Sequence, residues 1–232
     1  MLRKADFVEL MIEQQVLQFG EFKLKSGRMS PYFFNLGNIS DAKGTAALGA
    51  AYANKIAELG WEFDLIFGPA YKGIPIAVAT GVALSTQNQP NAAVPQNPGI
   101  SYNRKEAKNH GEKGVLVGAD VRGKRVLIVD DVLTAGTAVR EAQGVIKAAG
   151  GQLVGVLVAL DRGELPAKTN PEEVGTGSQK SLTAIEHLSE LLQVPIASLV
   201  GLEDVIAYLD RKPHHLDAVA RVREYRDAYC RQ

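Results

Sequence analysis

One stretch of the chain decides the fold: Val126-Leu127-Ile128-Val129-Asp130-Asp131-Val132-Leu133-Thr134-Ala135-Gly136-Thr137-Ala138. Its first four residues are apolar and predict a strand that is buried on both faces. Two carboxylates follow at the end of this strand, and a short loop of small residues then leads into a predicted helix over 137–149. In open α/β sheets, ligands bind at the carboxyl ends of the strands. The stretch therefore predicts an α/β fold with a ligand site around Asp130 and Asp131.

The loop after the two acids has the features of a phosphate site. Gly136 allows a tight turn and a close approach of the backbone to a ligand. Amide N–H groups at the helix start, together with the Thr134 and Thr137 hydroxyls, can hold a phosphate. Because carboxylates repel a phosphate, the acid pair is expected to accept hydrogen bonds from sugar hydroxyls or to help hold a cation. The alternative is a strand end whose acids are solvated and bind no ligand. It would explain an isolated acid pair, but it does not explain the whole pattern.

Outward from this segment, short apolar strands alternate with helices. The pattern predicts strands over 64–67, 153–160 and 196–200, helices over 48–59, 74–84 and 182–192, and short helices from about residue 202. Before them it predicts a helix over 4–18, ended by Gly20, and strands over 21–24 and 32–35. Continuous apolar strands between helices indicate a central, mostly parallel sheet flanked by helices. We expect a single domain over 1–232, with polar insertions at about 86–99 and 163–181.

Composition excludes several functional classes. Twenty-six basic residues balance twenty-six acidic ones, so binding to nucleic acid or to an anionic membrane through a positive field is not expected. Cys230 is the only cysteine, which excludes an intrachain disulfide and fits a cytoplasmic protein. No run reaches the ~18 apolar residues that would span a bilayer.

The quoted stretch resembles the signature of the type I phosphoribosyltransferases, in which a hydrophobic strand, two acids and a Thr-Gly-Thr type loop follow one another. The resemblance implies the fold of that family, with a small N-terminal hood that binds the base. In that family the acids meet the ribose hydroxyls of phosphoribosyl pyrophosphate and the loop holds its 5-phosphate. Those roles are implied here for Asp130 and Asp131 and for the loop residues Val132, Leu133, Thr134, Ala135, Gly136, Thr137 and Ala138.

Three further stretches resemble the orotate phosphoribosyltransferase family, and they occur in the family's order. They are 22–35, with Phe22-Lys23-Leu24-Lys25-Ser26-Gly27-Arg28 and Ser30-Pro31-Tyr32-Phe33-Phe34-Asn35; 67–75, with Phe67-Gly68-Pro69-Ala70-Tyr71-Lys72-Gly73-Ile74-Pro75; and 102–112, with Tyr102-Asn103-Arg104-Lys105-Glu106-Ala107-Lys108-Asn109-His110-Gly111-Glu112. By resemblance, phosphoribosyl pyrophosphate is bound by Lys25, Tyr71, Lys72, Arg104, Lys105, Lys108 and His110. Orotate is bound by Phe33, Phe34, Thr134 and Arg162.

Residues alone support these roles in part. The two phenylalanines can offer a flat apolar surface to a planar ring, although at least one of them is expected to serve the core. The charged stretch at about 104–114 suggests a mobile basic loop that clamps an anion, with a solvated charged loop as the alternative. Arg162 matches the family arginine that faces the orotate carboxylate, a pairing that suits a guanidinium. After Arg162 the family commonly has Gln-Glu, whereas this chain has Gly163-Glu164-Leu165-Pro166.

The resemblance implies a magnesium-dependent transfer of ribose-5-phosphate from phosphoribosyl pyrophosphate to orotate, which gives orotidine 5′-monophosphate and pyrophosphate in UMP biosynthesis. The expected catalytic residues are Lys25, Lys72, Lys105, Asp130 and Asp131. We expect Mg²⁺ to be held mainly by the substrate's oxygens, with Asp130 or Asp131 assisting through water, and we name no certain metal ligand. The basic loop is expected to reach the partner subunit's site, which implies a homodimer with shared active sites.

Two other functions share part of this pattern. A purine phosphoribosyltransferase would have the acid pair and its loop, but it would give no reason for Arg162 or for the two phenylalanines. A regulator that kept the fold and lost catalysis would have no use for the basic loop. It would also need a surface for nucleic acid, which the balanced charge does not support.

Overall fold

The computed structural model describes residues 3–24, 26–86, 94–108, 114–133, 136–165, 182–212 and 216–231. In chain order the elements are α1 (Lys4–Glu13), β1 (Leu17–Lys23), β2 (Met29–Phe34), a 3-10 turn (Leu36–Asn38), α2 (Ala42–Leu59), β3 (Leu65–Gly68), α3 (Gly73–Thr86), β4 (Gly99–Lys108), β5 (Gly114–Gly118), β6 (Arg125–Val132), α4 (Thr137–Ala148), β7 (Gln152–Asp161), α5 (Ala184–Leu192), β8 (Ile196–Gly201), α6 (Leu202–Leu209) and α7 (Leu216–Tyr229). Within these ranges, no helix is long and apolar enough to cross a membrane.

The central sheet has six strands in the order β5-β4-β3-β6-β7-β8. The pairs from β4 through β8 are parallel, and β5 alone runs antiparallel to its neighbour β4. This arrangement confirms the α/β fold with a mostly parallel sheet. Strand β6, which carries the acid pair, lies between β3 and β7, so the carboxyl ends of three parallel strands meet around it.

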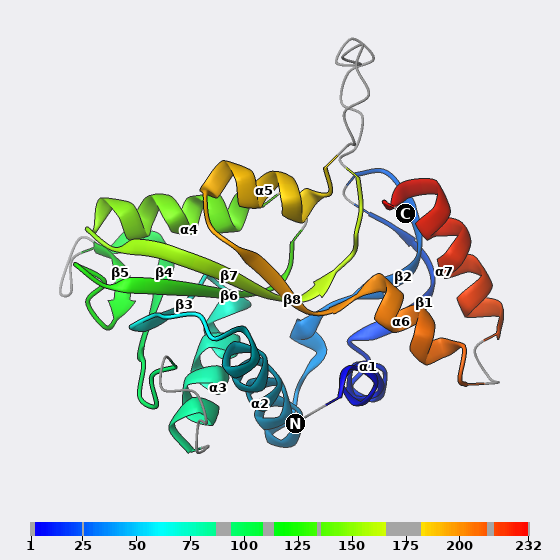
Figure 1. The fold of residues 1–232 in the computed structure, drawn as a ribbon, viewed down its shortest axis with the longest axis horizontal. Coiled ribbons are helices and arrows are strands. Elements are labelled where there is room, and N and C mark those ends of the chain that lie inside the picture. The colour runs from blue at the N-terminus through cyan, green and yellow to red at the C-terminus, as the bar shows by residue number, and fades with distance from the viewer. Residues whose placement is uncertain are drawn as a thin grey trace, which may run out of the picture.

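Alternate residues of β6 pack on opposite faces of the sheet. Val126 and Ile128 belong to the core that includes residues of α4 and α5. Leu127 and Val129 belong to the core on the other face, which includes residues of α2 and α3. Figure 1 shows these two pairs of helices on opposite sides of the sheet. Burial on both faces explains why the strand is a continuous apolar run, since neither face meets water.

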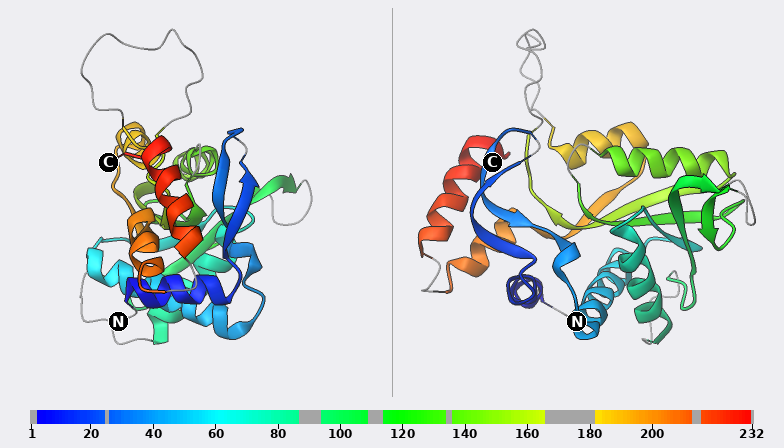
Figure 2. Two further views of the ribbon diagram at one scale, coloured as in Figure 1. Left: turned by 90° about the vertical axis from the view of Figure 1, so that its right-hand side faces the viewer. Right: turned by 180° about the vertical axis from the view of Figure 1, so that it is seen from behind.

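A second unit stands at one end of the sheet. Strands β1 and β2 form an antiparallel pair, which is the predicted small N-terminal subregion. The C-terminal helix α7 packs on β2, and α6 packs on both α1 and α7. Figures 1 and 2 agree that α7 lies beside the β1–β2 pair, so the two ends of the chain build this unit together.

The first helix is shorter than predicted. α1 ends at Glu13, and Gln15 takes a left-handed backbone conformation with φ of 54°. Leu17 then begins β1 and pairs with Phe34 of β2, so Gly20 lies inside a strand and does not end the helix. The helix prediction was wrong over 14–18 because its apolar residues fit both periodicities, and pairing with a distant strand decides between them.

Part of the predicted basic loop is also a strand. Residues 104–108 belong to β4, which pairs with β5 so that Asn103 lies opposite Leu116 and Lys108 lies opposite Gly114. Residues 109–113 lie outside the described residues. The prediction placed the loop too early because this part of β4 is polar and lacks the alternation that marks a half-buried strand.

The structure describes the ends of the two predicted insertions. α3 continues to Thr86, Val94 is buried in the core and β4 begins at Gly99, while 87–93 lies outside the described residues. At the beginning of the second predicted insertion, Glu164 pairs with Cys230 as an isolated antiparallel bridge. Residues 166–181 lie outside the described residues.

Candidate active site

The candidate site lies where three parallel strands end. β3 ends at Gly68, β6 at Val132 and β7 at Asp161, and the register pairs Leu65 with Val126 and Val132 with Leu160. The residues that follow these strands, Tyr71 and Lys72 after β3 and Arg162 after β7, therefore flank the acid pair from two sides. The topology brings together groups that are up to 91 positions apart in the chain (71 and 162).

The acid pair lies within the last three residues of β6, because the strand continues through Asp130 and Asp131 to Val132. Asp130 is buried, and its Oδ1 accepts a hydrogen bond from the backbone N–H of Asp131 at 2.9 Å. Burial, and secondarily the neighbouring Asp131 carboxylate, raises the pKa of Asp130 to about 7. Its backbone oxygen accepts a hydrogen bond from the Tyr52 hydroxyl of α2 at 2.6 Å, which fixes the strand end from below.

A lysine and a tyrosine from the β3–α3 turn stand beside these acids. Lys72 Nζ lies 2.7 Å from Asp131 Oδ2, and this lysine side chain remains half exposed. The ring of Tyr71, which is 67% exposed, lies 4.9 Å from Lys105 Nζ of β4. Asn103 of β4 accepts a hydrogen bond from the backbone N–H of Ala70 at 3.0 Å. The turn is thus tied to β4, and it places Lys72 beside Asp131 and Tyr71 beside Lys105.

The loop after the acid pair is described in part. Leu133 and Gly136 are buried, Val132 is half-buried, and Thr137 and Ala138 are exposed at the start of α4. Gly136 precedes the helix with a left-handed φ of 67°. A Cβ there would lie 2.8 Å from a Leu188 side-chain atom. Glycine is therefore required for both conformation and space, as a tight phosphate loop demands. Thr134 and Ala135 lie outside the described residues.

The two predicted ring-binding phenylalanines differ in exposure. Phe34 is buried in the core, whereas Phe33 is 38% exposed and stacks on Phe22 with 5.4 Å between ring centroids. Successive residues of a strand point to opposite faces, so only Phe33 presents its ring outside the core. For Phe34 the side chain serves packing.

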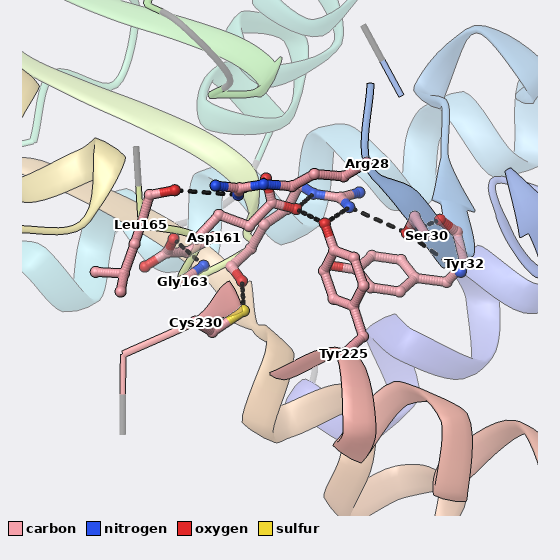
Figure 3. Close-up of polar contacts among 10 residues, drawn as sticks. Arg28, Ser30, Tyr32, Asp161, Gly163, Leu165, Tyr225 and Cys230 are labelled. Carbon is pink, nitrogen blue, oxygen red and sulfur yellow. Dashed lines mark hydrogen bonds and ion pairs between the residues drawn. The ribbon is translucent and has the colours of Figure 1, made fainter. Parts of the chain in front are cut away.

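Arg162 follows β7 and is held among aromatic and polar side chains. Only 7% of it is exposed, and its Cζ lies 4.3 Å from the centroid of the Tyr32 ring. Its Nε donates to Glu164 Oε1 at 2.6 Å, and its Nη2 donates to Ser30 Oγ at 3.2 Å. Figure 3 draws this cluster, with Ser30 and Tyr32 from β2 on one side and Tyr225 from α7 nearby. The positive charge is thus neutralised within the chain before any ligand binds.

Several predicted site residues cannot be located. Lys25, His110, Thr134 and Ala135 lie outside the described residues, and the side chain of Lys108 is not described. Arg104 lies on β4, one position before Lys105. Sequence reasoning missed the roles of Tyr52, Asn103, Glu164 and Tyr225, which support the site residues from distant elements. Asn103 was quoted within the stretch 102–112 and Glu164 as a departure from the family pattern, but neither was given this role, and no sequence signal marks the roles of Tyr52 and Tyr225.

No preformed metal site is evident. In the described ranges, no three His, Cys, Asp or Glu side chains gather closely enough to hold a metal ion. The acid pair offers two carboxylates, one of which is paired with Lys72. Such a donor set fits an ion that keeps several waters and shares oxygens with a phosphate-bearing ligand, as Mg²⁺ does.

Comparisons with known proteins point in one direction. Residues 35–175 match the model of the phosphoribosyl transferase domain. The protein named orotate phosphoribosyltransferase from Klebsiella pneumoniae (strain 342) is 47% identical over 226 residues, which cover 97% of each chain. Its namesake from Cellvibrio japonicus is 46% identical and covers 97% of this chain and 96% of its own.

Solved structures agree with the sequence relatives. The orotate phosphoribosyltransferase of Francisella tularensis has a TM-score of 0.78 and 33% identity, and the match covers 97% of this chain and 99% of that one. The UMP synthase of Leishmania donovani has a TM-score of 0.72 at 24% identity, covering 96% of this chain and 42% of that one. The latter is a likeness of fold.

Proposed function

The chain belongs to the orotate phosphoribosyltransferase family, and from this premise we propose that the residues around Asp130 and Asp131 form its active site. The reaction transfers ribose-5-phosphate from phosphoribosyl pyrophosphate to orotate and releases pyrophosphate. The observation that carries the site assignment is the meeting of three strand ends. They bring an acid pair, a lysine 2.7 Å from one of the acids, and an arginine on the far side into one region.

The acid pair binds the ribose. Carboxylate oxygens accept hydrogen bonds from sugar hydroxyls, and two adjacent acids match two adjacent hydroxyls of a ribose ring. Burial holds Asp130 in place, and its pKa of about 7 lets part of the population be neutral near pH 7. Below the acids, the turn through Gly136 into α4 is the phosphate-binding segment, because helix N-termini offer free N–H groups and a favourable dipole.

Cations neutralise the leaving group. Positive charge builds on the sugar and negative charge on the departing pyrophosphate, so fixed positive charges beside the pyrophosphate lower the barrier. Lys72 and Lys105 are the exposed cations next to the site, and Arg104 and Lys108 share the strand with Lys105. When bound, Mg²⁺ adds charge neutralisation at the pyrophosphate oxygens, with Asp130 or Asp131 able to assist through water.

Arg162 and Phe33 recognise orotate. A guanidinium suits the carboxylate that distinguishes orotate from other pyrimidine bases. Phe33 is an exposed ring of the β1–β2 unit, and it stacks on Phe22, which is half-buried. Thr134, Lys25 and His110 keep their predicted roles as sequence-based proposals. A purine base carries no carboxylate and would leave Arg162 without a ligand partner.

We further propose that the enzyme is a homodimer with shared active sites, in which the basic segment acts on the partner subunit. The position of that segment supports this proposal, because it lies in the β4–β5 hairpin and β5 is the last strand on that side of the sheet. A cytoplasmic location likewise remains a prediction from the sequence.

The acid pair offers the direct test of this site. The variant Asp130→Asn with Asp131→Asn should retain the fold by circular dichroism and lose measurable turnover, because amides cannot replace both charged acceptors. The matched control is Glu141→Gln with Glu190→Gln, which removes two exposed carboxylates from α4 and α5. Near-normal turnover of the acid-pair variant would refute the site assignment.

A further inference from the structure

Glu164 is the charged partner of Arg162 and is itself held by other groups. Its Oε1 accepts a hydrogen bond from the Tyr225 hydroxyl at 2.7 Å as well as the one from Arg162 Nε at 2.6 Å. Its Oε2 lies 3.7 Å from Arg28 Nη1. A buried guanidinium requires such an anion, and the anion requires further donors to remain in one orientation. The arginine, the glutamate and the tyrosine therefore form one fixed chain of contacts.

Tyr225 is placed to hold that glutamate. It is buried on α7, and its ring packs edge-on against the Tyr32 ring with 5.9 Å between centroids. Burial, and then the hydrogen bond to Glu164, raises the pKa of Tyr225 to about 12, so the hydroxyl keeps its proton near pH 7 and donates it. The same hydroxyl lies 3.5 Å from Arg162 Nη2, a long and weak contact.

The backbone links the end of α7 to the segment after Arg162. The Leu165 N–H donates to the Tyr229 carbonyl at 2.9 Å, and the Arg231 N–H donates to the Gly163 carbonyl at 3.1 Å. The Cys230 thiol donates to the Arg162 carbonyl at 3.3 Å. Figure 3 shows Gly163, Leu165 and Cys230 together at this junction. The C-terminal helix and the segment 162–165 are thus one packed unit.

We propose that Glu164 and Tyr225 are positioning residues, which hold the Arg162 guanidinium in the orientation that receives the orotate carboxylate. This assignment rests on the proposed function, in which Arg162 binds orotate. Glu164 occupies Nε, and Nη2 is directed to Ser30. Within the described part of the chain Nη1 makes no hydrogen bond. The proposal assigns that amino group to the orotate carboxylate, so the contacts of α7 with Glu164 would influence affinity for the base.

The test measures KM for orotate, KM for phosphoribosyl pyrophosphate and kcat in four variants of the full chain. Tyr225→Phe removes one hydroxyl, Glu164→Gln removes the charge at nearly constant shape, and Arg162→Lys removes the guanidinium. Tyr229→Phe is the matched control on the same helix, since its ring contacts Arg28 and its hydroxyl has no hydrogen bond to Arg162. Circular dichroism and thermal unfolding identify any variant that loses its fold.

We expect Tyr225→Phe to raise KM for orotate about threefold to tenfold, the size of one lost hydrogen bond. Glu164→Gln should raise it at least as much, while KM for phosphoribosyl pyrophosphate stays within about twofold and Tyr229→Phe behaves like wild type. If Arg162→Lys raises KM for orotate but Tyr225→Phe and Glu164→Gln do not, the positioning role is wrong and the proposed function stands. If Arg162→Lys leaves KM for orotate unchanged, Arg162 does not bind the base and both are overturned. An equal rise in both KM values for Tyr225→Phe would identify a structural role only.

Discussion

Asp130 combines burial with a proposed role as a hydrogen-bond acceptor. It is a buried group, for which the charged form is disfavoured, and in the proposed function it is an acceptor for sugar hydroxyls. The strand end resolves the conflict locally, because the Asp131 N–H donates to its carboxylate and Lys72 balances the charge of its neighbour. Without substrate, however, burial still raises the pKa of Asp130 from 3.8 to about 7. Such raised values are typical of functional sites.

This pKa predicts how stability depends on pH. Between the unfolded value of 3.8 and the folded value of about 7, the folded state holds a proton that the unfolded state has lost. Raising the pH through this window should therefore destabilise the free protein, and the effect is complete above pH 7. Asp130→Asn removes this titration. The free energy of unfolding of wild type relative to the variant should fall by about 3 kcal/mol from pH 5 to pH 8.

Urea unfolding of both proteins at several pH values measures that difference. Comparing the two cancels the titration of other carboxyls, such as Asp64, whose pKa is lowered to about 2 by its hydrogen bonds to Arg125. A difference in free energy that does not change with pH would show that Asp130 titrates normally.

For single residues, the sequence predicts the positions of side chains that follow a strand directly. Lys72, Asp131 and Arg162 were placed correctly at the strand ends because each stands within four positions of a strong apolar strand. Glu164 and Tyr225 could not be assigned in the same way. Glu164 stands two positions after Arg162, but the Tyr225 that holds it lies 61 positions further along the chain. A glutamate in a turn or a tyrosine on a helix is also ordinary in isolation.

The start of α4 is the element on which the site depends most. Gly136 must adopt φ of 67°, and the space next to its Cα is filled by Leu188 of α5. The turn therefore fixes where the helix N-terminus points and how α4 packs on α5. A left-handed conformation at a position without room for a side chain is strongly specific for glycine.

Gly136→Ala should lower the free energy of unfolding by about 1–3 kcal/mol, since alanine is strained at this φ and its methyl group meets Leu188. The control is Gly144→Ala on the exposed face of the same helix, where a Cβ would meet nothing within 4 Å. That change should instead stabilise the protein by about 0.5–1 kcal/mol, because alanine favours the helix. Denaturant unfolding distinguishes the two, and equal effects would mean that the turn at Gly136 is not constrained.

Elements were predictable where one periodicity dominates. β3, β6, β7 and β8 are short apolar runs between helices, and each begins within one residue of its expected position, although β6 extends beyond its apolar run through the acid pair to Val132. The hairpin of β4 and β5 and the start of β1 were not predicted. These strands exist because a partner strand supplies hydrogen bonds, and their own residues either lack alternation or fit a helix equally well.

At the scale of the whole molecule, the proposed binding groups are distributed between the sheet and the unit formed by β1, β2 and α7. The carboxyl ends of the strands carry the groups proposed for the phosphate and the ribose, and the smaller unit carries the groups proposed for the base. Arg162 directly follows β7 of the sheet and contacts the smaller unit through Ser30 and Tyr32. It therefore joins the two halves of the proposed site.

The proposed shared site is tested with two inactive variants. Lys105→Ala damages the basic segment, and Asp130→Asn with Asp131→Asn damages the acid pair. If the segment acts on the partner, a mixed dimer contains one intact site, so activity should return after subunit exchange. In the single chain Lys105 lies 4.9 Å from the ring of its own Tyr71, which makes this test necessary. Absence of recovery despite demonstrated exchange would place the segment in its own subunit's site.

The central claim is that this chain transfers phosphoribosyl groups to orotate and not to a purine. The most direct measurement follows the ultraviolet absorbance of orotate after addition of the purified protein, phosphoribosyl pyrophosphate and Mg²⁺, with pyrophosphate release measured in parallel. We predict that orotate is consumed with one pyrophosphate released per orotate, and that adenine and hypoxanthine in its place are not consumed. Turnover of a purine with orotate unchanged, or no reaction with any of the three bases, would contradict the account.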